Sequence, residues 1–192
     1  MSTEEISELR HLEFVVLGLV SEHPCHGKDI NKRIKERGMR AWTAIGESST
    51  YGVLKNLKNK GLLESWVEEE DNRVVKIYKI TEKGTKLLKR MILKILSEFF
   101  GKNDPDFYMA FSMLPCLSQK EQIEVFSNSL KKIKIHKKEL EEMLAENTHQ
   151  PLNVRGLFIH PIKILQADIE FLKKVIEEIK QGGGQFESKP LS

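Results

Sequence analysis

Residues 48–60 combine side chains that can hydrogen-bond to nucleic acids with a spacing that places them on one side of a helix. At about 100° per residue, Ser48, Lys55 and Asn59 share one edge, and the apolar side chains share the opposite edge. The apolar edge holds Val53, Leu54 and Leu57 together with Thr50. Hydroxyl and amide groups bond to base edges, and lysines pair with phosphates. An ordinary solvated helix face has the same pattern, so the neighbouring elements must decide between the two interpretations.

This helix has recognisable signals at both ends. Ser48 and Ser49 are suited to the N-cap, and Gly61 is suited to the left-handed position that follows a helix. Gly52 lies on the polar edge, where the missing side chain would let the backbone approach a nucleic acid closely. The side chains available for base edges are Ser48, Ser49, Asn56 and Asn59, and those available for phosphates are Lys55, Lys58 and Lys60.

The elements around this helix predict a winged helix–turn–helix domain. We expect helices at 7–21, 25–38 and 48–60, strands at 63–68 and 74–80, and a helix from 81 to 100 that begins at a Thr81 cap. In this element order the third helix enters the major groove and the hairpin, called the wing, reaches the neighbouring backbone. Arg73 and Lys76 would serve the wing, although an acidic run precedes them at 68–71.

The distribution of charge agrees with an anionic partner. Residues 26–90 hold sixteen Lys and Arg against nine Asp and Glu, whereas the net charge of the whole chain is only +3. A basic excess confined to one third of a chain is the electrostatic footprint expected for nucleic-acid binding. Proteins that bind no nucleic acid also show an excess of this size, so the charge alone decides little.

Composition limits the class of protein. The 192 residues, 40% of them hydrophobic, are enough to bury a core. The acidic start MSTEEISELR lacks the cationic region of a secretory signal, and no uncharged run approaches the roughly 20 apolar residues that span a bilayer. The two cysteines are far apart and fit a reducing compartment. We therefore expect a cytoplasmic protein without a membrane partner.

A composition shift at 102–118 predicts a second domain. Two long apolar stripes with alternating spacings of three and four follow it, which is typical of coiled-coil helices. The second stripe holds Phe158, Ile162, Leu165, Ile169, Leu172 and Ile176. The predicted domains are 7–100, 101–180 and a flexible tail at 181–192, and the fold class is mainly α with a small β-hairpin. The spacing alone allows these helices to pair within one chain or between two chains.

Enzymatic chemistry has little support in the sequence. There is no glycine-rich phosphate loop, no carboxylate pair at catalytic spacing and no serine nucleophile motif, so we expect neither an enzyme nor a cofactor. His23, Cys25 and His26 offer three metal ligands before a helix, but neighbouring residues rarely close a tetrahedral site. A turn with a buried Cys25 and a capping His26 is the favoured interpretation, and a redox role would need a lowered thiol pKa.

Three segments resemble the PadR-like family of transcriptional regulators. They are LGLVSEHPCHGKDINKRIKE (17–36), SSTYGVLKNLKNKGLLE (48–64) and KIYKITEKGTKLL (76–88), and DFYMAFSMLPCLS with PLNVRGLFIHPIKIL resembles the longer C-terminal region of one branch. The similarity extends from about residue 12 to 180. In this chain, Lys28 stands where the family commonly has Tyr, and Gly52 stands where it commonly has Pro.

This resemblance implies a dimeric winged-helix repressor whose C-terminal helices form the dimer. Tyr51 would contact the DNA backbone, and the second apolar stripe given above would pack against another subunit. The DNA-binding residues expected are Lys28, Ser48, Ser49, Thr50, Tyr51, Lys55, Asn56, Lys58, Asn59, Arg73 and Lys76. Some family members resemble sensors with an aromatic cavity, and the residues expected for such a small-molecule effector site are Phe99, Phe100, Phe107, Tyr108 and Phe111.

We therefore predict a sequence-specific regulator of double-stranded DNA, with residues 48–60 in the major groove and the hairpin at 63–80 as the wing. The alternative is a winged-helix module that binds proteins and no DNA. Salt distinguishes the two, because neutralising phosphates makes affinity for duplex DNA fall steeply with ionic strength.

Overall fold

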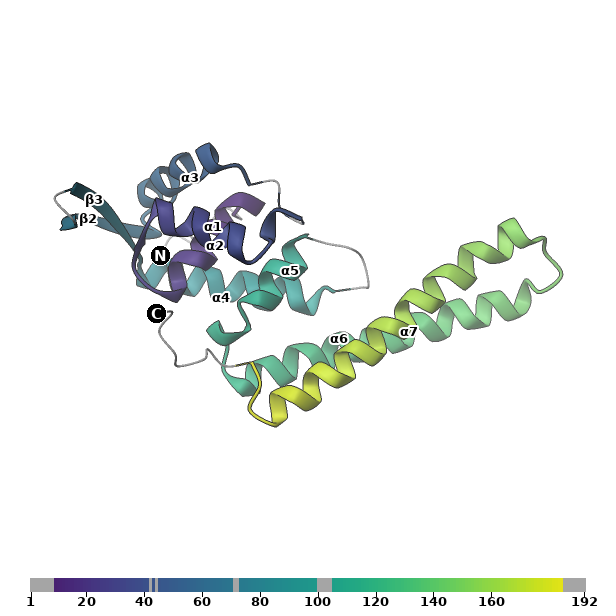
Figure 1. Ribbon diagram of the computed structural model, residues 1–192. Helices are drawn as coiled ribbons and strands as arrows, with labels where there is room; N and C mark the ends of the chain where they lie inside the picture. Colours follow the sequence, from purple (N-terminus) through teal and green to yellow (C-terminus); the bar gives the residue numbers. More distant parts are fainter. Residues whose placement is uncertain (1–8, 42, 44, 71–72, 100–104, 185–192) are drawn as a thin grey trace, which may run out of the picture. The chain divides into compact units, whose positions relative to one another are not determined.

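The computed structural model describes residues 9–41, 43, 45–70, 73–99 and 105–184 (Figure 1). It is mainly helical with one small sheet, which confirms the predicted fold class. The chain divides into two compact units, residues 1–91 and 92–192. The predicted domain boundary near 101 and most of the predicted tail lie outside the described residues, so the limits of the domains stay a prediction.

The first unit contains the predicted order of helices and strands. Its elements are α1 (His11–Glu22), β1 (Cys25–His26), α2 (Gly27–Glu36), the 3-10 turn η1 (Met39–Ala41), α3 (Glu47–Asn59), β2 (Leu63–Glu70), β3 (Arg73–Ile80) and the first part of α4 (Glu82–Ser97). Residues 14–20 of α1 are all buried, so this helix is the central element of the core. Leu54 and Leu57 of α3 are fully buried, as their position on the apolar edge predicted.

The C-terminal end of α3 is fixed by a complete Schellman motif. Gly61 has φ +70, its N–H donates to the Lys58 carbonyl at 2.9 Å, and the Leu62 N–H donates to the Leu57 carbonyl at 3.0 Å. The prediction for Gly61 is confirmed. The predicted Ser48/Ser49 cap is wrong, because α3 begins one residue earlier, with Gly46 at the N-cap and no side-chain capping bond.

Thr81 and Gly84 join the end of α3 to the wing and to α4. The Thr81 hydroxyl donates to the Gly61 carbonyl at 2.8 Å and accepts from the Gly84 N–H at 3.0 Å, which confirms Thr81 as a capping residue. The Thr81 N–H also donates to the Leu62 carbonyl. A Cβ atom on Gly84 would lie only 2.3 Å from the Leu62 carbonyl oxygen, so only glycine fits there.

The sheet has three strands in the order β1-β3-β2, all antiparallel, whereas the sequence predicted a two-stranded hairpin. The missed strand, β1, pairs Cys25 with Tyr78 and His26 with Ile77. Two residues are too few to show a strand period in the sequence. The pairing holds the start of α2 beside the C-terminal part of β3.

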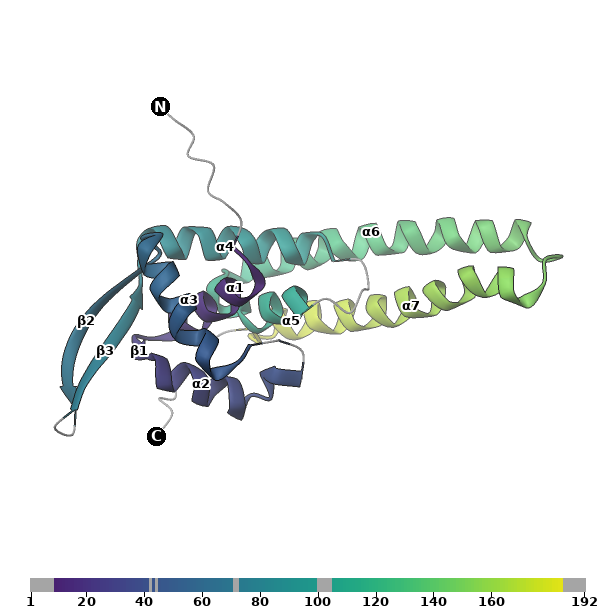
Figure 2. The same cartoon turned by 90° about the horizontal axis from the view of Figure 1, so that it is seen from above.

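In the second unit, α6 (Gln119–Glu146) and α7 (Leu152–Lys180) form an antiparallel hairpin and lie side by side in both views (Figures 1 and 2). The two predicted long helices are confirmed, and α7 continues through Pro161. Leu165, Ile169 and Leu172 are buried within this chain at 4%, 5% and 0% exposure. Their prediction as dimer-interface residues is corrected, because the pairing of α6 with α7 already covers them.

The remaining predicted interface residues, Phe158, Ile162 and Ile176, are half-buried at the edges of this hairpin. The second unit also contains the end of α4, the helix α5 (Pro105–Ser112) and the 3-10 turn η2 (Leu114–Cys116).

The aromatic residues of the predicted effector site form a packed cluster in the second unit. The rings of Phe99 and Phe107 stack with centroids 3.9 Å apart, and Phe111 lies 5.9 Å from Phe107 and 6.0 Å from Phe126. Phe99 and Phe107 are buried, whereas Tyr108 is 43% exposed. Phe100 lies outside the described residues. These contacts are those of a hydrophobic core, and the effector site stays a prediction.

Replacing Gly84 should test the junction of α3, the wing and α4. We expect Gly84→Ala to lower the free energy of unfolding by about 1–3 kcal/mol in urea denaturation, because the new methyl group would clash with the Leu62 carbonyl. Gly52→Ala is the matched control, since nothing lies within 4 Å of its Cβ position and α3 should gain up to about 1 kcal/mol. Equal stability of the wild type and Gly84→Ala would contradict the close approach.

Candidate nucleic-acid interface

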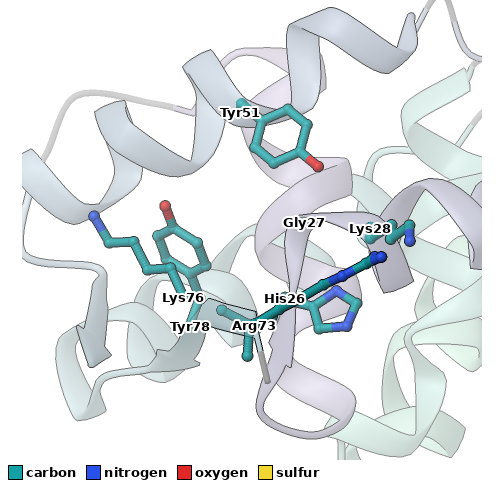
Figure 3. A pocket seen from close by; sticks show the side chains of 8 residues that line it. His26, Gly27, Lys28, Tyr51, Arg73, Lys76 and Tyr78 are labelled. Carbon is teal, nitrogen blue, oxygen red and sulfur yellow. The ribbon is translucent and has the colours of Figure 1, made fainter. Parts of the chain in front are cut away.

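An open groove of about 680 Å³ lies between the start of α2, the outer side of α3 and the strand β3 (Figure 3). It is lined by His26, Gly27, Lys28, Tyr51, Arg73, Val75, Lys76 and Tyr78, and we call it the basic groove. Four of the predicted DNA-binding residues, Lys28, Tyr51, Arg73 and Lys76, therefore meet at one place although they come from three elements. His26 and Tyr78 were not predicted to belong to a binding site.

Local structure explains how α2 and α3 meet at this groove. The His26 Nδ1 accepts from the Asp29 N–H at 3.3 Å, and the Asp29 Oδ2 accepts from the His26 N–H at 3.2 Å, so the two residues form a capping box that starts α2. A Cβ atom on Gly27 would lie 2.7 Å from the Tyr51 Cε1 atom. The Tyr51 ring thus packs directly over Gly27, which accounts for the glycine after His26.

The electrostatic character of the groove is cationic. Lys28, Arg73 and Lys76 contribute positive charges, and none of the described residues that line the groove is acidic. The Lys76 ammonium lies 5.6 Å from the centroid of the Tyr78 ring, in cation–π range. Burial and, to a lesser extent, the nearby Tyr51 raise the pKa of Tyr78, so its hydroxyl stays protonated and available as a donor. This combination of cations and phenols suits phosphate oxygens.

The outer edge of α3 is open beside the basic groove. Tyr51 is 54% exposed, Lys55 and Asn59 are exposed as predicted from the helical spacing, and Lys58 is exposed as well. Nothing lies within 4 Å of the Cβ position of Gly52, so the backbone is accessible there. Ser49 is half-buried, and the side chain of Ser48 lies outside the described residues.

Thr50 must be removed from the predicted DNA contacts. Its side chain is 0% exposed, and its hydroxyl donates to the Asn31 Oδ1 at 2.7 Å. The residue lies on the apolar edge of α3, where it connects α3 to α2. Its role is therefore to hold the two helices together.

A buried carboxylate that the sequence analysis did not single out as functional contacts the flank of α3. Glu13 of α1 is 2% exposed, and its Oε1 accepts from the Asn56 Nδ2 at 2.5 Å and from the Lys60 Nζ at 2.6 Å. Its Oε2 accepts from the Arg10 N–H at 3.0 Å. Lys60 is consequently held in an ion pair, and Asn56 has one of its two amide protons engaged.

A signal for this contact is present in the sequence. Glu13 is the one charged residue in the apolar run at 12–20, and a buried charge requires a partner. Asn56 and Lys60 are four residues apart, so they share one flank of α3. The spacing within each helix was visible, but the pairing of the two helices was not.

The pKa of Glu13 is lowered from the usual value of 4.5. Burial opposes this shift, but the hydrogen bond from Lys60, the Arg10 backbone N–H and the positive charge of Lys60 outweigh it. Glu13 is therefore ionised at neutral pH, and its carboxylate can only accept hydrogen bonds.

The His23, Cys25 and His26 segment forms the predicted turn. Cys25 is buried in β1 and His26 caps α2, while His23 is exposed. Burial raises the pKa of the Cys25 thiol more than the nearby Arg33 lowers it, which is the opposite of the shift that a redox role requires. Among the described residues, no group of three His, Cys, Asp or Glu side chains is placed to hold a metal ion.

The two strands of the wing differ in charge. Glu68 and Glu69 of β2 are exposed, and Glu68 accepts from the Trp66 Nε1. Arg73 and Lys76 of β3 line the basic groove. The cationic side of the wing is therefore the β3 side, and the acidic residues lie on the edge strand.

Comparison with known proteins identifies the family. Residues 16–90 match the model of the transcriptional regulator PadR-like family, a range that runs from α1 into α4 and includes every residue of the basic groove. A PadR-like transcription factor from Bacteroides fragilis is 31% identical over 41% of this chain and 74% of that chain, with a TM-score of 0.36. This chain belongs to the PadR-like family. The family is one of transcriptional regulators, not of enzymes.

Other solved structures are similar to this PadR-like chain. A protein of Streptococcus mutans UA159 is 31% identical over 46% of this chain and 81% of that chain, with a TM-score of 0.38. Bacillus subtilis PadR in complex with operator DNA is 20% identical over 88% of this chain and 99% of that chain, with a TM-score of 0.44. No curated protein matches the chain. Within the described residues, none of the helices has the length and apolar character needed to cross a membrane.

The pH dependence of stability should report the Glu13 ion pair. Because the pKa of Glu13 is lower in the folded chain than in the unfolded chain, its contribution is complete above about pH 5 and is lost as pH falls through the folded pKa. We therefore expect the stability difference between the wild type and Glu13→Gln, measured by urea denaturation, to be constant at neutral pH and to shrink towards about pH 3. Glu142→Gln is the control, since the Glu142 side chain is 63% exposed in a surface pair with Lys138. A difference that does not change with pH would contradict an ionised Glu13.

Proposed function

We propose that this chain is a cytoplasmic, homodimeric repressor that binds double-stranded DNA sequence-specifically. The observation that carries the proposal is the basic groove, where Lys28, Arg73 and Lys76 meet beside the open polar edge of α3. Cations in a concave site suit a phosphate backbone, and an open helix edge with amide and lysine side chains suits the major groove. Together they support one continuous surface for a duplex.

In this proposal α3 lies in the major groove. Lys55 and Lys58 pair with phosphates on either side, and the Asn59 amide reads a base edge. Gly52 leaves room for the backbone of α3 to approach the duplex, since nothing fills its Cβ position. Tyr51 spans both regions, because it is exposed on α3 and also lines the basic groove.

The basic groove holds the adjacent backbone. Lys28 adds a charge at the start of α2, where the helix dipole and backbone N–H groups also favour an anion. Arg73 and Lys76 approach the same strand from the wing. The acidic residues of β2 keep the other edge of the wing away from phosphates, so the wing contacts DNA with β3 only.

Dimerisation uses a surface of α7 that differs from the predicted one. Leu157, Ile164 and Phe171 are 71%, 37% and 40% exposed, although all three are large and apolar. They recur every seven residues, so they form one stripe along the helix beside the face that packs on α6. A second copy of the chain is the proposed occupant, because two such stripes are self-complementary around a two-fold axis.

In this proposal the protein represses transcription by occupying a promoter. A small-molecule effector then releases the protein from the DNA. Bacillus subtilis PadR has been crystallised with p-coumaric acid. In this chain an effector would have to enter the packed cluster of Phe99, Phe107 and Phe111, next to the exposed Tyr108. Movement of α6 and α7 would then change the separation of the two α3 helices, which matched half-sites require to be about 34 Å.

The salt dependence of duplex binding tests the proposal directly. The logarithm of the association constant should fall linearly with the logarithm of salt concentration, and Lys55→Ala or Lys76→Ala should each reduce that slope by about 1 per subunit. Lys138→Ala is the control, because this lysine is 77% exposed on α6 and outside the proposed surface. Fluorescence anisotropy of a labelled duplex measures all three. The absence of duplex binding at low salt would favour the protein-binding alternative.

A charge placed on the α7 stripe tests the dimer. We expect Ile164→Glu to convert the wild-type dimer to a monomer in sedimentation velocity, because two buried carboxylates at a self-complementary stripe repel each other and lack partners. Ile135→Glu is the matched control, since Ile135 is a 52% exposed isoleucine on α6. A wild-type monomer, or an Ile164→Glu variant that remains dimeric, would contradict this interface.

A further inference from the structure

We propose that Glu13 is a positioning residue that sets the orientation of the Asn56 amide and thereby creates a preference for adenine at one position of each half-site. This inference rests on the proposed function, because it assumes that α3 enters the major groove. Glu13 itself does not touch DNA in this account, since it is 2% exposed. It acts only through Asn56.

The chemistry of the two groups permits a single arrangement. An ionised carboxylate has acceptors only, so the amide must point its Nδ2 towards Glu13, as the 2.5 Å contact with Oε1 shows. A rotated amide would place its Oδ1 against a carboxylate oxygen and lose the hydrogen bond. The contact therefore excludes the amide rotation that an exposed asparagine normally has.

The carboxylate is itself firmly held. Lys60 donates to the same Oε1 at 2.6 Å, and the Arg10 N–H donates to Oε2 at 3.0 Å. These bonds come from α3 and from the start of α1, so the carboxylate is fixed with respect to both helices. Because its acceptor is fixed, the Asn56 side chain is already ordered before it binds a base. It therefore loses less conformational entropy on binding.

The groups that remain on Asn56 match one base. Its Oδ1 accepts, and its second amide proton donates, and Asn56 is exposed on α3. Adenine presents the complementary pair in the major groove, with N6 as donor and N7 as acceptor. At about 100° per residue, Asn56 lies about 60° around the helix from Asn59, so both amides reach the same side of a groove.

The test begins with the base preferences of the wild-type chain. Duplexes selected from a random pool define the preferred site, and anisotropy with single-base variants gives the discrimination at each position. Asn56→Ala should reduce discrimination by about 5- to 150-fold at one adenine position of each half-site. Glu13→Gln should reduce it at the same position, because glutamine can either accept from the amide or donate to it and so no longer fixes its orientation.

A double-mutant cycle separates positioning from general stability. The double variant should lose no more discrimination at that position than Asn56→Ala alone, because Glu13 acts only through Asn56. Leu57→Val is the control for stability, since the Leu57 side chain is fully buried on the apolar edge of α3 and does not face the proposed DNA surface. It should lower the unfolding midpoint and leave base preferences unchanged.

Each outcome decides the inference. Unchanged preferences in Glu13→Gln, or equal loss at every position, would overturn it. If Glu13→Gln does not fold, Asn56→Ala decides alone, and the absence of a change at an adenine position would overturn the inference. Wild-type protein that binds no duplex would overturn the proposed function as well, whereas wild-type binding with an unaltered adenine preference in the variants would overturn this inference only.

Discussion

The burial of the apolar edge of α3 against the rest of the first unit is the constraint on which the interface depends. Leu54 and Leu57 are fully buried, so the opposite edge, with Lys55 and Asn59, has to face outward. Polar contacts then fix the helix along its length: Thr50 bonds to Asn31 near its start, and Glu13 holds its flank. A helix held in this way keeps its exposed side chains in one fixed arrangement.

The basic groove is also part of the first unit, and residues of its helices and strands line it. The pairing of β1 with β3 brings the start of α2 to the wing, and Gly27 leaves the space that the Tyr51 ring fills. Lys28, Arg73 and Lys76 reach the groove as a consequence of backbone pairing. In the proposed complex the sheet and α2 supply phosphate contacts through the basic groove, and α3 supplies both further phosphate contacts and the base readout.

The sequence predicted those features that depend on local spacing. The two edges of α3, the left-handed Gly61, the Thr81 cap and the two long C-terminal helices all follow from periods and turn residues within one segment. The strand β1 is too short to have a period, the bond between Thr50 and Asn31 joins two different helices, and Glu13 reaches α3 across 43 residues of sequence. The prediction that Leu165 and Leu172 lie at a dimer interface failed for a related reason. A single apolar stripe on a helix fits a partner helix in the same chain as well as one in another chain.

The central claim is that the open edge of α3 occupies a major groove twice per dimer. Methylation protection tests it most directly, because dimethyl sulfate reacts with guanine N7 in the major groove and with adenine N3 in the minor groove. On a selected duplex, the account predicts protection of guanine N7 in two patches about 10 base pairs apart, or a multiple of that spacing. Protection of adenine N3 alone, or no protection at guanine N7 in a saturated complex, would contradict it.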